Sequence, residues 1–131
     1  MLYHEASGRI VVEDSGKLST VPQNAAQNYL VADPLPDNVM LFTVNVVSED
    51  CITLRNAEGK YLTNDKLAWA DTMEEGITTW RLNARNGAWQ LLTTGDDRPK
   101  ALEIYKANLS TYTAEPRDNF CFNFYEPLSR D

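Results

Sequence analysis

Residues 52–82, ITLRNAEGKYLTNDKLAWADTMEEGITTWRL, decide the fold that we predict for this chain. The stretch contains four short apolar runs separated by polar, turn-forming residues, which is typical of short β-strands. Its apolar pattern returns 42 positions later, in the pairs Leu62 and Ile104, Leu67 and Leu109, Trp80 and Phe122, and Leu82 and Phe124. Because the offset is constant across three separate strands, it indicates an internal repeat.

A fainter copy of the same pattern precedes this stretch. Residues 8–11 (GRIV) match residues 59–62 (GKYL) at an offset of 51, whereas Phe42 matches Trp80 at an offset of 38. The two offsets differ by 13, so the first copy contains about 13 additional residues. We place them in the Pro- and Asn-rich segment 20–38.

Three copies of a four-strand unit predict an all-β fold, a β-trefoil-like barrel of about 12 short strands in three pseudo-repeats. The first and last strands of each unit would close the barrel and leave few open edges, and the middle hairpins would cap one end. Phe42, Trp80 and Phe122 would then meet in one core. The single domain would span residues 1–131, with repeat 1 at 1–48 (insert 20–38), repeat 2 at 49–86 and repeat 3 at 87–127.

Turn residues mark the expected hairpins. Asn86-Gly87 is the strongest two-residue hairpin signal, and it predicts strands at 79–84 and 88–93. Gly16-Lys17 is expected to close an earlier hairpin, and a short strand is expected at 28–32 within the insert. Sustained helical periodicity is absent from the sequence.

Composition limits the classes of partner. The chain has 131 residues, a net charge of −7 and a pI near 4.6. This acidity argues against binding to a nucleic-acid backbone, which depends on Lys and Arg, and against docking on anionic membranes. The sequence has no run of 18 apolar residues and no visible signal peptide, so we expect either an intracellular protein or a piece of a larger secreted one.

Residues with catalytic or metal-binding chemistry are sparse. His4 is the only histidine, lacks a partner motif and is expected on a surface strand. Cys51 and Cys121 lie out of phase with their inward-facing neighbours and are expected to be unpaired thiols. Asp96-Asp97 offers oxygen ligands for calcium, but without EF-hand spacing. We therefore assign no catalytic residue, no metal site and no cofactor.

Exposed aromatic residues are the remaining candidates for a site. A pyranose face stacks on an aromatic ring while its hydroxyl groups bond to nearby polar side chains. On this basis the candidate ligand-binding residues are Trp69, Tyr105, Tyr112, Asp71 and Asn108. Alternatively, these rings pack over the end of the barrel. Trp89 is in phase with Leu91 and is expected in the core.

Two segments carry a family resemblance. Residues 101–126, ALEIYKANLSTYTAEPRDNFCFNFYE, and residues 52–65, ITLRNAEGKYLTND, followed by TTWRL, resemble an accessory β domain of large secreted 5′-nucleotidase-type hydrolases of Gram-positive bacteria. The second segment is also similar to the fascin-type trefoil repeat. The likeness covers about residues 40–126. It implies an extracellular, non-catalytic module beside a separate catalytic domain. The chain lacks the phosphoesterase metal-ligand motif and the QxW signature of ricin-type lectins.

The favoured hypothesis is therefore a non-catalytic accessory or binding module of an extracellular bacterial multidomain hydrolase. Its partner would be a glycan or a neighbouring domain, without nucleic acid or membrane, and the module would be a monomer. Two alternatives stay open, an OB-type nucleic-acid-binding barrel and a small enzyme with an acidic site.

Overall fold

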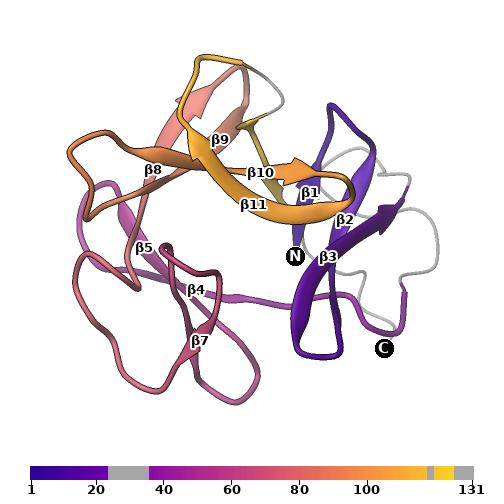
Figure 1. The fold of residues 1–131 in the computed structure, drawn as a ribbon, viewed down its shortest axis with the longest axis horizontal. Coiled ribbons are helices and arrows are strands. Elements are labelled where there is room, and N and C mark those ends of the chain that lie inside the picture. Colours follow the sequence, from indigo (N-terminus) through magenta and orange to yellow (C-terminus); the bar gives the residue numbers. More distant parts are fainter. Residues whose placement is uncertain (24–35, 118–119, 126–131) are drawn as a thin grey trace.

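The computed structural model describes residues 1–23, 36–117 and 120–125, and in this part the chain forms twelve β-strands and no α-helix (Figure 1). The all-β prediction is confirmed, whereas the strand expected at 28–32 lies outside the described residues. The strands are β1 (Leu2–His4), β2 (Arg9–Asp14), β3 (Lys17–Pro22), β4 (Thr43–Val46), β5 (Cys51–Arg55), β6 (Tyr61–Leu62), β7 (Trp69–Ala70), β8 (Trp80–Arg85), β9 (Ala88–Thr93), β10 (Lys100–Tyr105), β11 (Asn108–Thr113) and β12 (Asn123–Phe124).

The strands join into one curled antiparallel sheet. Eleven of them follow the order β12-β1-β2-β3-β11-β10-β9-β8-β5-β6-β7, and β4 pairs with β5 outside this path. Backbone bridges tie the curled sheet together at two more places, between Trp89 and Phe122 and between Val12 and Val39. In Figure 1 the strands curve around a shared interior, with β1 lying behind β10 and β11 in this view.

Three two-residue turns set the register of the long hairpins. Ser15-Gly16 joins β2 to β3, Asn86-Gly87 joins β8 to β9, and Lys106-Ala107 joins β10 to β11. All six residues have positive φ, between 49° and 80°, which is the signature of a type I′ turn. The Asn86-Gly87 hairpin is thus confirmed, and the first hairpin turns one residue earlier than Gly16-Lys17.

The main core cluster lies inside the curl. Trp80 and Phe122 are its largest members and are completely buried, and Phe42 packs against them from a partly buried position. All eight residues of the 42-position offset belong to this cluster or pack against it. The twelve buried members are Leu2, Val11, Leu18, Met40, Ile52, Leu54, Leu62, Trp80, Leu91, Leu102, Leu109 and Phe122.

Three expected placements are wrong. Trp89 is 38% exposed, because it lies near the start of β9, beside the β8–β9 turn, where the strand is less buried than at Gln90–Thr93. His4 is 4% exposed, because β1 lies between β12 and β2 and the ring of Phe122 stands 5.0 Å from its imidazole. Neither Cys51 nor Cys121 forms a disulfide among the described residues, and Cys121 is buried although its strand phase predicted an outward position.

Candidate functional site

The outer face of the β10–β11 hairpin forms one wall of a groove of about 710 Å³. This groove is larger than the other cavity described below, and two exposed aromatic rings line it. We call it the tyrosine groove. Its lining residues are Glu103, Tyr105, Ser110, Tyr112, Glu115, Arg117 and Phe120.

The strand register explains why these side chains share one face. Tyr105 pairs with Asn108, Glu103 with Ser110 and Ala101 with Tyr112, and cross-strand partners in an antiparallel pair point the same way. The alternate residues, among them Leu102, Ile104 and Leu109, face the main core cluster. The hairpin is therefore amphipathic, and burial of its apolar face fixes the outward direction of both tyrosines.

The two tyrosine rings are accessible. Tyr105 is 60% exposed and Tyr112 is 58% exposed, although aromatic side chains of this size usually bury most of their surface. The ammonium group of Lys106 lies 5.4 Å from the centre of the Tyr105 ring, within the range of a cation–π contact. Ala101, Leu92 and Phe120 form a small apolar cluster beneath the Tyr112 end of the hairpin.

The tip of this hairpin is held by the first part of the chain. The carbonyl oxygen of Ala107 accepts hydrogen bonds from the Thr20 backbone N–H at 2.8 Å, from Thr20 Oγ1 at 2.7 Å and from Ser19 Oγ at 3.2 Å. Both donor residues belong to β3. These contacts fix the position of the turn, and with it the neighbouring Tyr105.

Of the described charged side chains that line the groove, Arg117 and Glu115 form an ion pair, whereas Glu103 does not. Arg117 Nε lies 2.7 Å from Glu115 Oε2, so these two charges neutralise each other. Glu103, which is half-buried midway along the hairpin, has no hydrogen-bond or ion-pair partner among the described residues. Burial raises the pKa of the Glu103 carboxyl above its usual value. The groove thus presents one carboxylate that is available to accept hydrogen bonds.

The five predicted site residues do not form one site. Tyr105 and Tyr112 share the tyrosine groove. Trp69 is half-buried on β7 and packs against the main core, with its ring centre 6.3 Å from that of Phe42. Asp71 lies beside β7 and pairs with Lys60 at 3.8 Å. Asn108 is exposed at the hairpin tip, outside the groove lining, where its Oδ1 accepts a hydrogen bond from Ser19.

Sequence reasoning missed five of the seven groove residues, Phe120 among them. Glu103 and Ser110 lie two positions from Tyr105 and Tyr112, so strand alternation alone was a sufficient signal for both. Glu115 and Arg117 come from the loop after β11, and the sequence gives no signal that this loop borders the groove.

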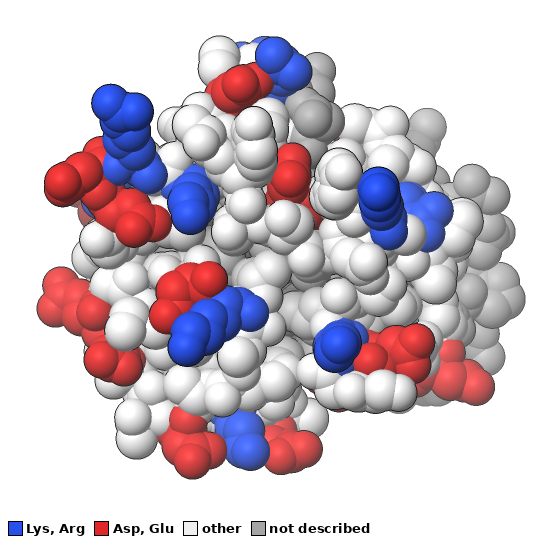
Figure 2. Space-filling view, in the orientation of Figure 1, with Lys and Arg blue, Asp and Glu red and all other residues white. Residues whose placement is uncertain are grey.

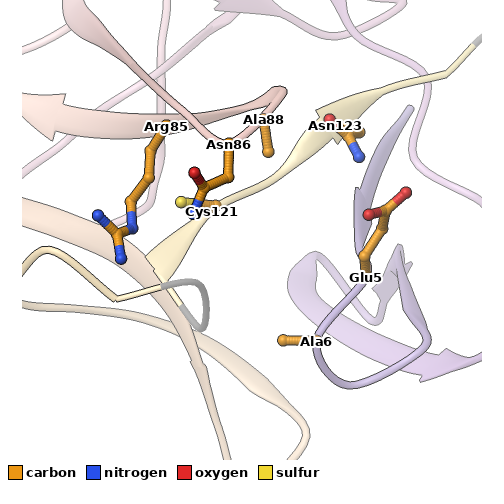
Figure 3. Close-up of a pocket in the computed structure, with 7 residues that line it drawn as sticks. All are labelled: Glu5, Ala6, Arg85, Asn86, Ala88, Cys121 and Asn123. Carbon is orange, nitrogen blue, oxygen red and sulfur yellow. The ribbon is translucent and has the colours of Figure 1, made fainter.

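A smaller cavity of about 280 Å³ lies between the β1–β2 turn and the β8–β9 hairpin (Figure 3). Glu5 and Ala6 line it from the first turn, and Arg85, Asn86 and Ala88 from the second. Three of its polar side chains interact within the protein: Glu5 accepts a hydrogen bond from the Tyr125 hydroxyl at 3.2 Å, and neither Arg85 nor Asn86 is free. It is therefore the weaker candidate for a ligand site.

In the described ranges no group of three or more His, Cys, Asp and Glu side chains is placed to hold a metal ion. Asp96 accepts a hydrogen bond from Thr93 Oγ1 at 3.1 Å. The imidazole of His4 bonds to Ser7 Oγ at 2.7 Å. No helix in the described part of the chain is long and apolar enough to span a bilayer.

The charged side chains are mixed on the face drawn in Figure 2. Acidic and basic groups alternate there, and no continuous basic area is seen on this face.

Comparisons with known proteins give no further assignment. No protein-family model matches the chain, and no curated protein matches it in sequence.

Proposed function

We propose that this chain is a non-catalytic binding module whose tyrosine groove holds a glycan. One observation carries the proposal: Tyr105 and Tyr112 are both more than half exposed on one face of the β10–β11 hairpin, with the unpartnered Glu103 between them. The groove of about 710 Å³ falls within the usual size range of ligand sites.

The chemistry of the groove suits a sugar. Two aromatic faces supply apolar area at a low cost in side-chain entropy, and they are flat enough to stack against the C–H face of a pyranose. The Glu103 carboxylate and the Ser110 hydroxyl supply acceptors for sugar hydroxyl groups. No catalytic role is assigned to these residues, because the proposed chemistry is stacking and hydrogen bonding.

We also propose that the curled sheet has trefoil-like pseudo-symmetry. The supporting pairings are those between successive units, β4–β5, β8–β9 and β12–β1, and the hairpins within each unit, β2–β3, β6–β7 and β10–β11. The 42-position offset adds to this support, because its eight residues share one core.

The parent protein remains part of the proposal. The resemblance of residues 40–126 to accessory domains of secreted Gram-positive 5′-nucleotidase-type hydrolases supports an extracellular module that carries its catalytic neighbour to a glycan-coated surface. In the competing proposal, the groove receives a neighbouring domain of the same protein.

A glycan array tests the proposal. The labelled protein is applied beside Tyr105→Ala, Tyr112→Ala and the two ring-retaining variants Tyr105→Phe and Tyr112→Phe. We expect each alanine variant to lose at least about fivefold in affinity, since a ring that stacks on a flat ligand such as a nucleobase contributes roughly 1–3 kcal/mol. The phenylalanine variants should stay within a few-fold of wild type.

Asp71→Ala is the control, because Asp71 is exposed and lies outside the groove. This variant should bind like wild type. A wild-type array without signal would overturn glycan binding. Unchanged binding by both alanine variants would move the ligand away from this groove.

A further inference from the structure

We propose that the tyrosine groove holds a linear, uncharged oligosaccharide of at least three sugar units, with one end unit on Tyr105, the other on Tyr112 and the middle unit at Glu103 and Ser110. This inference rests on the proposed glycan binding and adds the length and the charge of the ligand.

The length follows from the register of the hairpin. Tyr105 pairs with Asn108, which lies four residues before Tyr112 on the same strand. With a rise of about 3.4 Å per residue in an antiparallel strand, the two positions are about 14 Å apart along the hairpin. One pyranose is shorter than this distance, so a monosaccharide contacts only one of the two rings. A chain of three or more units reaches both.

The middle of the groove supplies polar partners. Glu103 and Ser110 face each other across the strands, two residues from either tyrosine. The Ser110 hydroxyl has only a long contact, 3.5 Å to the carbonyl oxygen of Thr111, and the Glu103 carboxylate has no partner among the described residues. Both groups are therefore available to the hydroxyl groups of a central sugar unit.

The charges of the groove select against anionic chains. Arg117 is the one cationic side chain among the described lining residues, and it is already paired with Glu115 at 2.7 Å. The Lys106 ammonium lies 5.4 Å from the centre of the Tyr105 ring, at the end of the groove, so it does not neutralise the middle position. An anionic sugar at the middle position would meet the unpaired Glu103 carboxylate, and like charges in a partly buried site repel each other. A neutral sugar would donate hydrogen bonds to the same carboxylate.

Calorimetric titration with chains of defined length tests the inference. The neutral probes are fully N-acetylated chito-oligosaccharides and cello- and malto-oligosaccharides of one to six units, and the anionic probes are oligogalacturonates of the same lengths. We expect the trisaccharide of the bound neutral series to bind at least tenfold more tightly than its monosaccharide, with little gain beyond four units. Tyr105→Ala and Tyr112→Ala should each remove this gain.

A charge variant tests the second half of the inference. In Glu103→Gln the preference for neutral over anionic trisaccharide should fall at least threefold, and in the matched control Asp71→Asn, whose carboxylate lies outside the groove, the preference should not change.

The outcomes separate the two proposals. Equal affinity for one and three units, with loss of binding in only one tyrosine variant, would overturn the extended chain and leave glycan binding in place. Wild-type protein that binds anionic and neutral trisaccharides equally would overturn the charge selection. Absence of binding to every probe and to the array would overturn both proposals.

Discussion

Trp80 contributes most to the core at the scale of a single residue. Its side chain is completely buried, and its indole Nε1 donates a hydrogen bond to the Leu62 carbonyl oxygen at 3.3 Å. Loss of this ring removes apolar burial, leaves a cavity in the main core cluster and leaves the Leu62 carbonyl oxygen without this donor.

We expect Trp80→Ala to lower the free energy of unfolding by about 3–5 kcal/mol. Urea unfolding measures the loss, and Trp80→Phe, which keeps an aromatic ring, should lose clearly less. The control is Trp89→Ala, because Trp89 is 38% exposed. Equal losses at positions 80 and 89 would contradict the placement of Trp80 in the core.

Glu103 shows the cost of placing a carboxylate in a groove. Burial raises its folded-state pKa, so its ionised form is less favourable in the folded protein than in the unfolded chain. The folded state is therefore relatively most stable below the unfolded pKa of about 4.3, and this contribution is lost as the pH rises through the raised folded value.

From this sign we expect Glu103→Gln to have a higher free energy of unfolding than wild type at pH 7. The difference should shrink as the pH falls and disappear below about pH 4, where the Glu103 carboxyl of wild type is mostly protonated in both the folded and the unfolded state. Denaturant unfolding across this pH range measures it. A difference that persists unchanged at pH 3 would show that the effect comes from packing and not from ionisation.

At the scale of the elements, the β10–β11 hairpin differs from the β8–β9 hairpin because both of its turn residues carry a Cβ atom and adopt the unfavourable positive φ. Lys106 and Ala107 have φ values of 49° and 66°, whereas the equivalent turn between β8 and β9 uses Asn86 and Gly87. Positive φ costs about 1 kcal/mol for a residue with a Cβ atom. The hydrogen bonds from Thr20 and Ser19 to the Ala107 carbonyl offset part of this strain.

We expect the double change Lys106→Asn and Ala107→Gly to raise the free energy of unfolding by about 1–2 kcal/mol. The reverse control is Gly87→Ala. An added Cβ at Gly87 meets no atom within 4 Å, so its expected loss of about 1 kcal/mol comes from the backbone alone. Thermal melts of both variants check the pair, and a destabilised double variant would contradict the strain at the turn.

The sequence predicts elements whose determinants are local. Alternation and the Asn-Gly turn placed strands at 79–84 and 88–93, close to β8 (Trp80–Arg85) and β9 (Ala88–Thr93). The type I′ conformation of the Lys106-Ala107 turn has no sequence signal, because contacts with β3 hold these two residues in a conformation that they disfavour.

The candidate site was only partly predictable for a related reason. Tyr105 and Tyr112 were named as candidates because aromatic residues near strand ends, beside polar residues, are visible in the sequence. Glu115 and Arg117 were missed, because a loop side chain reaches a groove only through the path of the folded backbone. Trp69 was assigned to a ligand but packs on the core, since the sequence does not distinguish an exposed ring from one that covers a core.

At the scale of the whole molecule, one sheet joins the two ends of the described chain. β1 pairs with β12, the amino group of Met1 donates a hydrogen bond to the Tyr125 carbonyl oxygen at 2.9 Å, and β3 pairs with β11 (Figure 1). The main core draws on all three proposed repeats. Among the described strands, therefore, no group forms an independent unit with its own sheet and core.

We expect this sheet to unfold in a single cooperative transition, as small single domains usually do. The far-UV circular dichroism and tryptophan fluorescence curves should coincide in urea, with midpoints equal within error. Trp69, Trp80 and Trp89 report from different strands, so variants that keep one tryptophan each test the same point locally. Separate midpoints for different tryptophans would indicate independently unfolding repeats.

The hydrogen bonds from Thr20 to the Ala107 carbonyl oxygen have a consequence for the rate of folding. The two residues are 87 positions apart in the chain. Pairings of such long range slow folding, because a large loop must close before they form. During synthesis β3 leaves the ribosome well before the β10–β11 hairpin has been made. The edge of β3 that pairs with β11 therefore stays unpaired until translation has passed residue 107.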